Sequence, residues 1–162
     1  HPRSNARGPA AIYHRHVDLT WHARAFGELT RDELYAILEL RERVFVVEQR
    51  CAYQEVDGKD PVCRHVWAAH GGEIVAYLRI IPAGEKYEEV AIGRVIVAQA
   101  MRGTGLGKEL MKRGLAAAGA VAVRLSAQAH LERFYVDLGF RRVSDVYDED
   151  GIPHVEMLRH SW

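Results

Sequence analysis

A segment in the second half of the chain, residues 97–108, reads Val97-Ala98-Gln99-Ala100-Met101-Arg102-Gly103-Thr104-Gly105-Leu106-Gly107-Lys108. It continues an apolar, β-branched run from Val90 to Ala98, which is typical of a central strand buried on both faces. It leads into residues 105–119, where apolar side chains recur at helical spacing and charged ones fill the other side. The order strand, glycine loop, helix predicts a mixed α and β domain.

The loop within this segment has the features of an anion site. Its glycines let the backbone approach a ligand closely. The unpaired amides in the first turn of the following helix, together with the positive end of the helix dipole, point toward such a ligand. The segment therefore predicts a cradle for a pyrophosphate, and an ordinary tight turn is the plainer alternative.

Two other glycine-loop motifs do not fit this segment. A dinucleotide-binding G-x-G-x-x-G that starts at Gly103 needs glycine where Lys108 stands. A Walker loop in this register needs glycine in place of Arg102 and Ser or Thr in place of Glu109. The pattern that remains is R-x-x-G-x-G over residues 102–107.

Upstream of this segment, the pattern predicts a strand and then a long helix. Residues 21–26 alternate weakly and are expected to open the sheet. Thr30 and Glu33 form a capping box, in which the hydroxyl and the carboxylate cover free amides at a helix start. A helix is therefore expected at about residues 31–47.

A polar loop and a hairpin are expected next. The loop covers residues 48–64. Residues 65–70 and 74–81 then read as two paired antiparallel strands, because Gly71-Gly72 between them supplies the positive φ angles of a two-residue turn.

Downstream of residue 119, the pattern alternates again. Residues 122–127 read as a strand parallel to the one before the glycine loop, since a helix crosses between the two. A short helix is expected at residues 130–138, closed by Gly139. Residues 141–147 and 155–159 are expected to form a closing hairpin.

Length and charge limit the classes of protein that fit. The chain has 162 residues, enough for one core, and we expect a single domain over residues 12–162, with residues 1–11 a tag remnant or disordered tail. Its 22 basic and 22 acidic residues give no overall positive field for nucleic acid or a membrane. With two cysteines and no long apolar span, we expect a reduced, cytoplasmic protein.

The loop also resembles a known family. Residues 102–107 are similar to the coenzyme A loop of the GCN5-related N-acetyltransferases (GNAT), and so is the order of the elements that follow. Over residues 20–160 the chain looks like the ElaA-type branch of that superfamily. The blocks that carry this closer resemblance are Arg43-Val44-Phe45-Val46-Val47-Glu48-Gln49, Tyr53-Gln54-Glu55-Val56-Asp57-Gly58, Ile92-Gly93-Arg94-Val95-Ile96-Val97, Ala127-Gln128-Ala129-His130-Leu131 and Glu149-Asp150-Gly151-Ile152-Pro153-His154.

The resemblance implies a fold and a donor. The fold is a single mixed, mostly antiparallel sheet, splayed beside the strand that binds acetyl-CoA and flanked by helices. The pantetheine arm would lie in the gap, with its amides paired to the backbone of Val95 and Val97. The residues implied to bind acetyl-CoA are Val95, Ile96, Val97, Arg102, Gly103, Thr104, Gly105, Leu106, Gly107, Lys108, Gln128 and Tyr135.

The resemblance also implies a reaction, the direct attack of a primary amine on acetyl-CoA in a ternary complex. Tyr135 matches the family tyrosine that protonates the departing sulfur, and a phenol with a pKa of about 10 suits that role. A tyrosine packed in the core is the plainer interpretation of Tyr135. Gln128 stands where many relatives carry an Asn that contacts the pantetheine.

The residues on the acceptor side are less defined. Candidates for the base are Glu48 and His65, with His65 closest to neutrality by its ordinary pKa. Glu55 and Asp57 are further candidates for the base, and they are also expected to bind the acceptor. Arg79 and Arg94 lie within apolar strands, where an unpaired charge would be costly. The sequence leaves two roles open for them, binding an anionic acceptor or pairing with buried carboxylates.

Other functions fit the residues less well. Zinc at Cys51, Cys63 and His65 would lack a fourth ligand, so no metal is expected. A coenzyme A-binding sensor without catalysis is the main alternative, and a different nucleotide-phosphate enzyme is a third. The acceptor is expected to be a small-molecule or protein amine, and the protein a monomer or homodimer.

Overall fold

The computed structural model of the chain describes residues 18–161, so the predicted tail at residues 1–11 lies outside the described residues. The strands are β1 Thr20–Ala25, β2 Arg64–His70, β3 Glu73–Ile81, β4 Val90–Val97, β5 Val123–Gln128, β6 Arg141–Arg142, β7 Tyr147–Glu149 and β8 Ile152–Arg159. The α-helices are α2 Arg31–Arg41, α3 Leu106–Ala118 and α4 Glu132–Val136, and the π-helix η2 spans Glu42–Glu48. Short 3-10 turns are η1 Phe26–Glu28, η3 Asp60–Val62, η4 Gln99–Met101 and η5 Ala129–Leu131.

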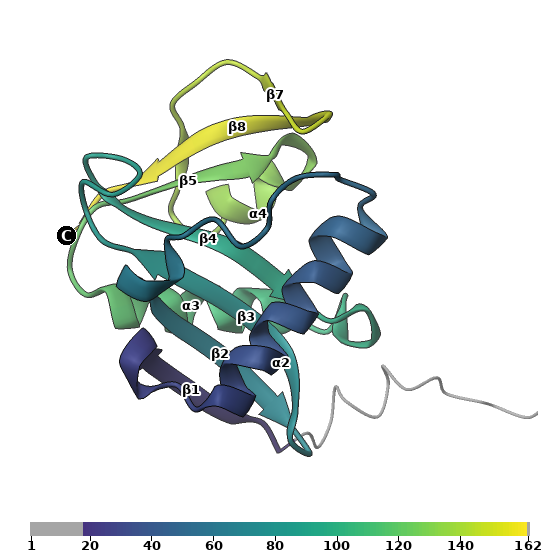
Figure 1. Ribbon diagram of the computed structural model, residues 1–162. Coiled ribbons are helices and arrows are strands. Elements are labelled where there is room, and N and C mark those ends of the chain that lie inside the picture. Colours follow the sequence, from purple (N-terminus) through teal and green to yellow (C-terminus); the bar gives the residue numbers. More distant parts are fainter. Residues whose placement is uncertain (1–17, 162) are drawn as a thin grey trace, which may run out of the picture.

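All of the strands belong to one sheet, in the order β1-β2-β3-β4-β5-β8-β6, with β7 also paired to β8. Every pairing is antiparallel except β4 with β5, which α3 connects as a crossover. Figure 1 shows α2 on one face of the sheet and α3 and α4 on the other. The prediction of a mixed, mostly antiparallel sheet flanked by helices is therefore confirmed.

The capping box at the start of α2 forms as predicted. The backbone amide of Glu33 donates to Thr30 Oγ1 at 3.1 Å, and the amide of Thr30 donates to Glu33 Oε1 at 2.9 Å. The predicted single helix over residues 31–47 is instead an α-helix that widens into a π-helix, with Gln49 N bonded to Val44 O five residues back. Over two turns, an apolar stripe does not distinguish the two spacings, so the sequence pattern missed this change.

The core lies on both faces of the sheet. One cluster fills the space between the sheet and α3, and a second lies between the sheet and α2. A Cβ added to Gly114 would meet Leu78 Cδ2 at 2.6 Å, so glycine at this position lets α3 pack close against β3. The hairpin turn at Gly71-Gly72 has φ angles of +56° and +81°, as predicted for a two-residue turn.

Strand β4 is irregular. Tyr77 on β3 pairs with Ile96, but Arg79, two residues on, pairs with Gly93, three residues back. One extra residue is therefore inserted in β4, and Arg94 takes a positive φ of 50° at this bulge. The sequence predicted a continuous strand here.

The sheet splays between β4 and β5. Parallel pairing joins Val90 with Val123 and Ala91 with Arg124, and within residues 18–161 no later pair joins the two strands. Strand β5 instead pairs with β8 along all of its residues. The carboxyl-terminal halves of β4 and β5 therefore diverge, as the family resemblance implied.

The closing hairpin is divided more finely than predicted. The expected strand at residues 141–147 is two short strands, β6 and β7, both paired to β8. Between them, Ser144 Oγ accepts the backbone amide of Glu156 at 2.8 Å, so a side chain replaces part of the strand ladder. The expected helix at 130–138 is η5 followed by α4, and Gly139 follows with a φ of +92°.

Candidate active site

The predicted anion loop connects η4 to α3 at the open end of β4. Gly103 and Gly105 have φ angles of +77° and +88°, which favour glycine, and a Cβ on either would meet open space. At Gly107 the backbone is helical, and a Cβ would make ordinary contacts with Val97 and Phe134 at 3.5 and 3.7 Å. Backbone conformation requires glycine at 103 and 105, whereas packing does not require it at 107.

Most backbone amides of this loop are free. Arg102 N donates to Gln99 O at 3.3 Å, and Leu106 N makes a long bond of 3.4 Å to Thr104 Oγ1. Among residues 18–161, no acceptor receives the backbone amides of residues 103, 104, 105, 107 and 108. These amides precede or begin α3, so the positive end of the α3 dipole lies behind them.

The side chain of Arg102 is partly engaged. Its Nε donates to Val97 O at 3.0 Å, and its Nη2 forms an ion pair with Glu48 Oε2 at 2.9 Å. Both side chains remain accessible, with 45% and 32% of their surfaces exposed. The predicted base Glu48 therefore lies beside the predicted anion loop, although the two are 54 residues apart in the chain.

The other predicted residues on β4 face different directions. Val95 and Val97 pack against the core beneath α3, whereas Ile96 is buried in the cluster beneath α2. Gln128 ends β5 and pairs with His154 on β8. Residues 95–97 and Gln128 thus lie on the two strands that diverge, one group on each side of the gap.

Tyr135 is buried in α4, and its hydroxyl has no hydrogen-bond partner among residues 18–161. Its ring meets Phe134 and Phe140 edge-on, with centroids at 5.0 and 5.8 Å. Among residues 18–161, the fully buried side-chain polar atoms without a partner are Asp60 Oδ2 and Arg79 Nε. The Tyr135 hydroxyl also has no partner there, so it is not fully enclosed. Burial raises the pKa of Tyr135 to about 12, which keeps the phenol protonated at neutral pH.

The predicted acceptor residues at 55, 57, 79 and 94 form an ionic network that is buried at Glu55 and Arg79. Arg79 binds both Asp57 and Asp60, and Arg94 binds Glu55 at 2.9 Å. Two further members were not predicted, Arg41 and Asp60, which pair at 2.7 Å. The complete network is Arg41, Arg79, Arg94, Glu55, Asp57 and Asp60.

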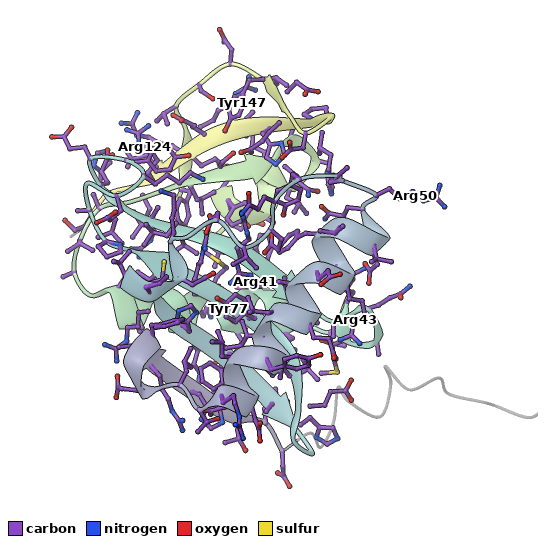
Figure 2. The ribbon with its side chains drawn as sticks, in the orientation of Figure 1. Arg41, Arg43, Arg50, Tyr77, Arg124 and Tyr147 are labelled. Atoms are coloured by element: carbon purple, nitrogen blue, oxygen red, sulfur yellow. The ribbon has the colours of Figure 1, made fainter. Side chains whose placement is uncertain are left out.

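The charges within the network balance, and this answers the question left open for the two strand arginines. Burial alone would raise the pKa of Asp57 and Asp60, but the arginine contacts outweigh it and hold both pKa values well below their usual range. Arg79 thus pairs with Asp57 and Asp60, and Arg94 pairs with Glu55. These carboxylates lie in residues 49–60, which we call the covering loop. Figure 2 shows Arg41 beside Tyr77, in the space between α2 and the sheet.

Arg41 could have been found from the sequence. It lies four residues after Ile37 and four before Phe45, so it falls on the apolar stripe of the helix. A charge in such a stripe indicates a buried partner. For Asp60, which follows the polar run 57–59, no comparable pattern exists.

His65 on β2 lies beside the ionic network and is fully buried. Its Nε2 lies 3.1 Å from the carbonyl of Asp60, which can only accept, so Nε2 carries the proton. Its Nδ1 then accepts from the Tyr77 hydroxyl at 2.7 Å. Burial lowers the pKa of His65, and with both ring nitrogens bonded this arrangement does not favour it as a base for an external amine.

Comparison with known proteins agrees with the geometry of the splayed sheet and the glycine loop. The chain matches the acetyltransferase (GNAT) domain family over residues 30–160, and it therefore belongs to the GCN5-related N-acetyltransferases. It is an acyltransferase of that family, whose enzymes use an acyl-CoA donor and an amine acceptor.

Within the family, the chain falls in the ElaA-type branch. Protein ElaA of Escherichia coli K12 is 45% identical over 147 residues, which cover 87% of this chain and 96% of that protein. The crystal structure of Escherichia coli ElaA has a TM-score of 0.84 and covers 88% of this chain and 100% of that one. An acyl-CoA N-acyltransferase from Pseudomonas aeruginosa has a TM-score of 0.84 at 48% identity, covering 88% and 99%.

No helix within residues 18–161 is both long and apolar enough to cross a membrane.

Proposed function

We propose that the chain is an acetyl-CoA-dependent N-acetyltransferase that transfers the acetyl group directly to a primary amine of a small molecule or protein. The observation that carries this proposal is the Tyr135 hydroxyl, which has no partner among the described residues and whose phenol stays protonated. A departing thiolate requires a proton donor, and a hydroxyl that makes no hydrogen bond within the described residues is available for that role.

The loop before α3 would hold the donor. The free amides between Gly103 and Lys108 suit the diphosphate of coenzyme A, because they present several N–H groups at a helix start. Arg102 uses two of its nitrogens on Val97 O and Glu48, and its remaining N–H groups would add positive charge to the cradle. The backbone of Val95 and Val97, with Gln128 across the gap, would guide the pantetheine arm.

Direct attack by the amine is favoured over a covalent acyl-enzyme. Cys51 and Cys63 are both buried. Burial raises the pKa of Cys63 to about 11, so its thiol stays protonated and unreactive. Tyr135 would then give its proton to the sulfur as the carbon–sulfur bond breaks, and it would recover a proton that the acceptor nitrogen loses.

The test is binding followed by turnover. Calorimetry with acetyl-CoA measures the cradle, and free-thiol release with ethanolamine, putrescine, glutamate and a lysine-containing peptide measures transfer. We expect binding, and thiol release with at least one amine. Binding without thiol release would instead favour a coenzyme A sensor, and absence of binding would exclude both functions.

The role of Tyr135 is tested by Tyr135→Phe, with Tyr35→Phe, a change at an exposed tyrosine, as the matched control. Because the Tyr135 hydroxyl makes no bond within the described chain, its loss should leave folding and acetyl-CoA binding unchanged. General acid catalysis is worth about 10²–10⁴-fold, so kcat should fall by about a hundredfold or more. An unchanged kcat would assign the proton to water or to another group.

A further inference from the structure

A second group of polar side chains lies on β5, β7 and β8, outside the site residues predicted from the sequence. We name it the β8 cluster: Ser126, Tyr147, Glu149 and His154. Ser126 Oγ donates to Glu149 Oε2 at 3.0 Å and also bonds the Tyr147 hydroxyl. The rings of Tyr147 and His154 stack with centroids at 6.2 Å, and Figure 2 shows Tyr147 beside the β7–β8 hairpin.

The hydrogen bonds of His154 leave one nitrogen incomplete. Its Nδ1 lies 2.7 Å from the carbonyl of Ile152, which can only accept, so Nδ1 carries a proton. In neutral His154, Nε2 then presents a lone pair, and it faces Glu149 Oε2 at 3.4 Å. Two acceptors at this distance require a proton or a cationic donor between them. A primary ammonium group supplies both.

The β8 cluster borders the gap in the sheet. His154 pairs with Gln128, the last residue of β5, so their side chains share one face. Leu125 and Ala127 point the other way, into the core that also contains Tyr135. The cluster and the phenol therefore lie on opposite faces of the strand that lines the gap.

The covering loop between η2 and η3 reaches the same place. Cys51 Sγ lies 3.7 Å from the carbonyl of Asp150 in the β7–β8 turn. This contact joins the loop that holds the ionic network to the hairpin that holds Glu149 and His154. Because Leu125 and Ala127 face α3 and α4, the β8 cluster lies on the face of the sheet where α2 lies.

The other acidic groups near the gap are already paired. Glu48 binds Arg102, and the carboxylates of the ionic network each bind arginine. Within residues 18–161, Glu149 forms no ion pair with an arginine or a lysine, and 44% of its side chain is exposed, against 12% of the His154 side chain. Other titratable groups around the cluster include Glu156, which binds Arg124, and Tyr87 and Lys86, which both interact electrostatically with Glu149.

We propose that Glu149 binds the ammonium group of the acceptor and that His154 Nε2 removes its proton before attack. This inference rests on the proposed function. The free amine then forms the new carbon–nitrogen bond and the carbon–sulfur bond breaks. Of the two protons that the ammonium nitrogen loses, His154 passes one to solvent, and the other replaces the proton that Tyr135 gives to sulfur.

The test compares His154→Gln with His160→Gln, the same change at an exposed histidine just beyond the end of the same strand. The measurement is kcat/KM against pH, with acetyl-CoA and whichever amine of the panel the wild type acetylates fastest. We expect His154→Gln to lose about 10²–10⁴-fold near pH 7, because the base is gone. The loss in kcat/KM should narrow as the pH approaches the pKa of the acceptor amine, because the amine then loses its proton without a base. Glu149→Gln should mainly raise the KM for the amine.

Several results would overturn the inference. If kcat/KM of His154→Gln stays within twofold of the wild type, or falls by the same factor at every pH, His154 is not the base. Acetyl-CoA affinity, measured by calorimetry, should be unchanged in His154→Gln. This measurement distinguishes the loss of the base from damage to the acetyl-CoA site. If the wild type releases no thiol with any amine, the proposed function fails instead. In that case, the ammonium site is tested by titrating the wild type with putrescine. We expect the imidazole resonances of His154 to shift, and the absence of a shift would reject the ammonium site.

Discussion

Arg41→Gln tests whether the ionic network is a structural device. The Arg41 side chain has no exposed surface, and it binds Glu55 and Asp60 at 2.7 Å each. Its removal takes the network from balanced to one excess negative charge, with Asp60 Oδ2 already unpaired. Breaking a buried ion pair by removing one partner costs about 3–5 kcal/mol. Because Glu55 keeps Arg94 and Asp60 keeps Arg79, we expect the lower end of that range.

The assay is urea unfolding followed by circular dichroism at pH 7, with Arg43→Gln as the control. Arg43 is exposed two residues along the same helical segment, and surface changes of this kind stay within about 0.5 kcal/mol. The deficit in unfolding free energy of Arg41→Gln should shrink below about pH 4, since protonation of a carboxylate then removes the excess negative charge of the network. A loss below about 1 kcal/mol at pH 7 would refute the assignment of the network as a charge-balanced support for the covering loop.

Three further outcomes are expected. Gly114→Ala should destabilise the protein by about 1–3 kcal/mol in the same assay, because the new Cβ would overlap Leu78 at 2.6 Å; a neutral change would show that α3 can shift. The folded-state pKa values of Asp57 and Asp60 are lowered, so their stabilisation is present above about pH 4 and should be lost as pH falls, which acid titration of unfolding tests; a flat profile would contradict it. The Cys63 thiol should react with iodoacetamide only as fast as the protein unfolds at pH 7, since burial raises its pKa to about 11; rapid alkylation of native protein would contradict this.

The features predicted correctly from the sequence are local ones. The capping box at Thr30, the glycine turn at residues 71–72 and the strand, glycine loop and helix around residues 97–108 each depend on neighbours a few positions apart. Turn and cap chemistry acts over that distance, so the residue types alone specify it.

The features that were missed depend on distant contacts. Arg41 meets Asp60 over 19 residues. The choice between the two roles left open for Arg94 depends on Glu55, which lies 39 residues away. The bulge at Arg94 is a property of the pairing between β3 and β4, and the pattern within β4 does not contain it. The same holds for Glu149 and His154, whose relation to the gap depends on the register of β5, β7 and β8.

The predicted acceptor residues show this limit of local patterns most clearly. The sequence suggested that Glu55 and Asp57 bind a substrate, and it left open whether Arg79 and Arg94 do so or pair with carboxylates. In the fold, each has its charge satisfied by another member of the network. A polar residue near a site is therefore by itself a weak indication of substrate binding.

The central claim is that free backbone amides before α3 grip a diphosphate, and calorimetry with two donors tests it most directly. Acetyl-CoA and S-acetylpantetheine share the thioester and the arm, but S-acetylpantetheine lacks the diphosphate and the 3′-phosphoadenosine attached to it. We predict a measurable heat of binding with acetyl-CoA and an affinity at least a hundredfold weaker with S-acetylpantetheine. Equal affinities, or no heat with acetyl-CoA on folded protein, would contradict the claim.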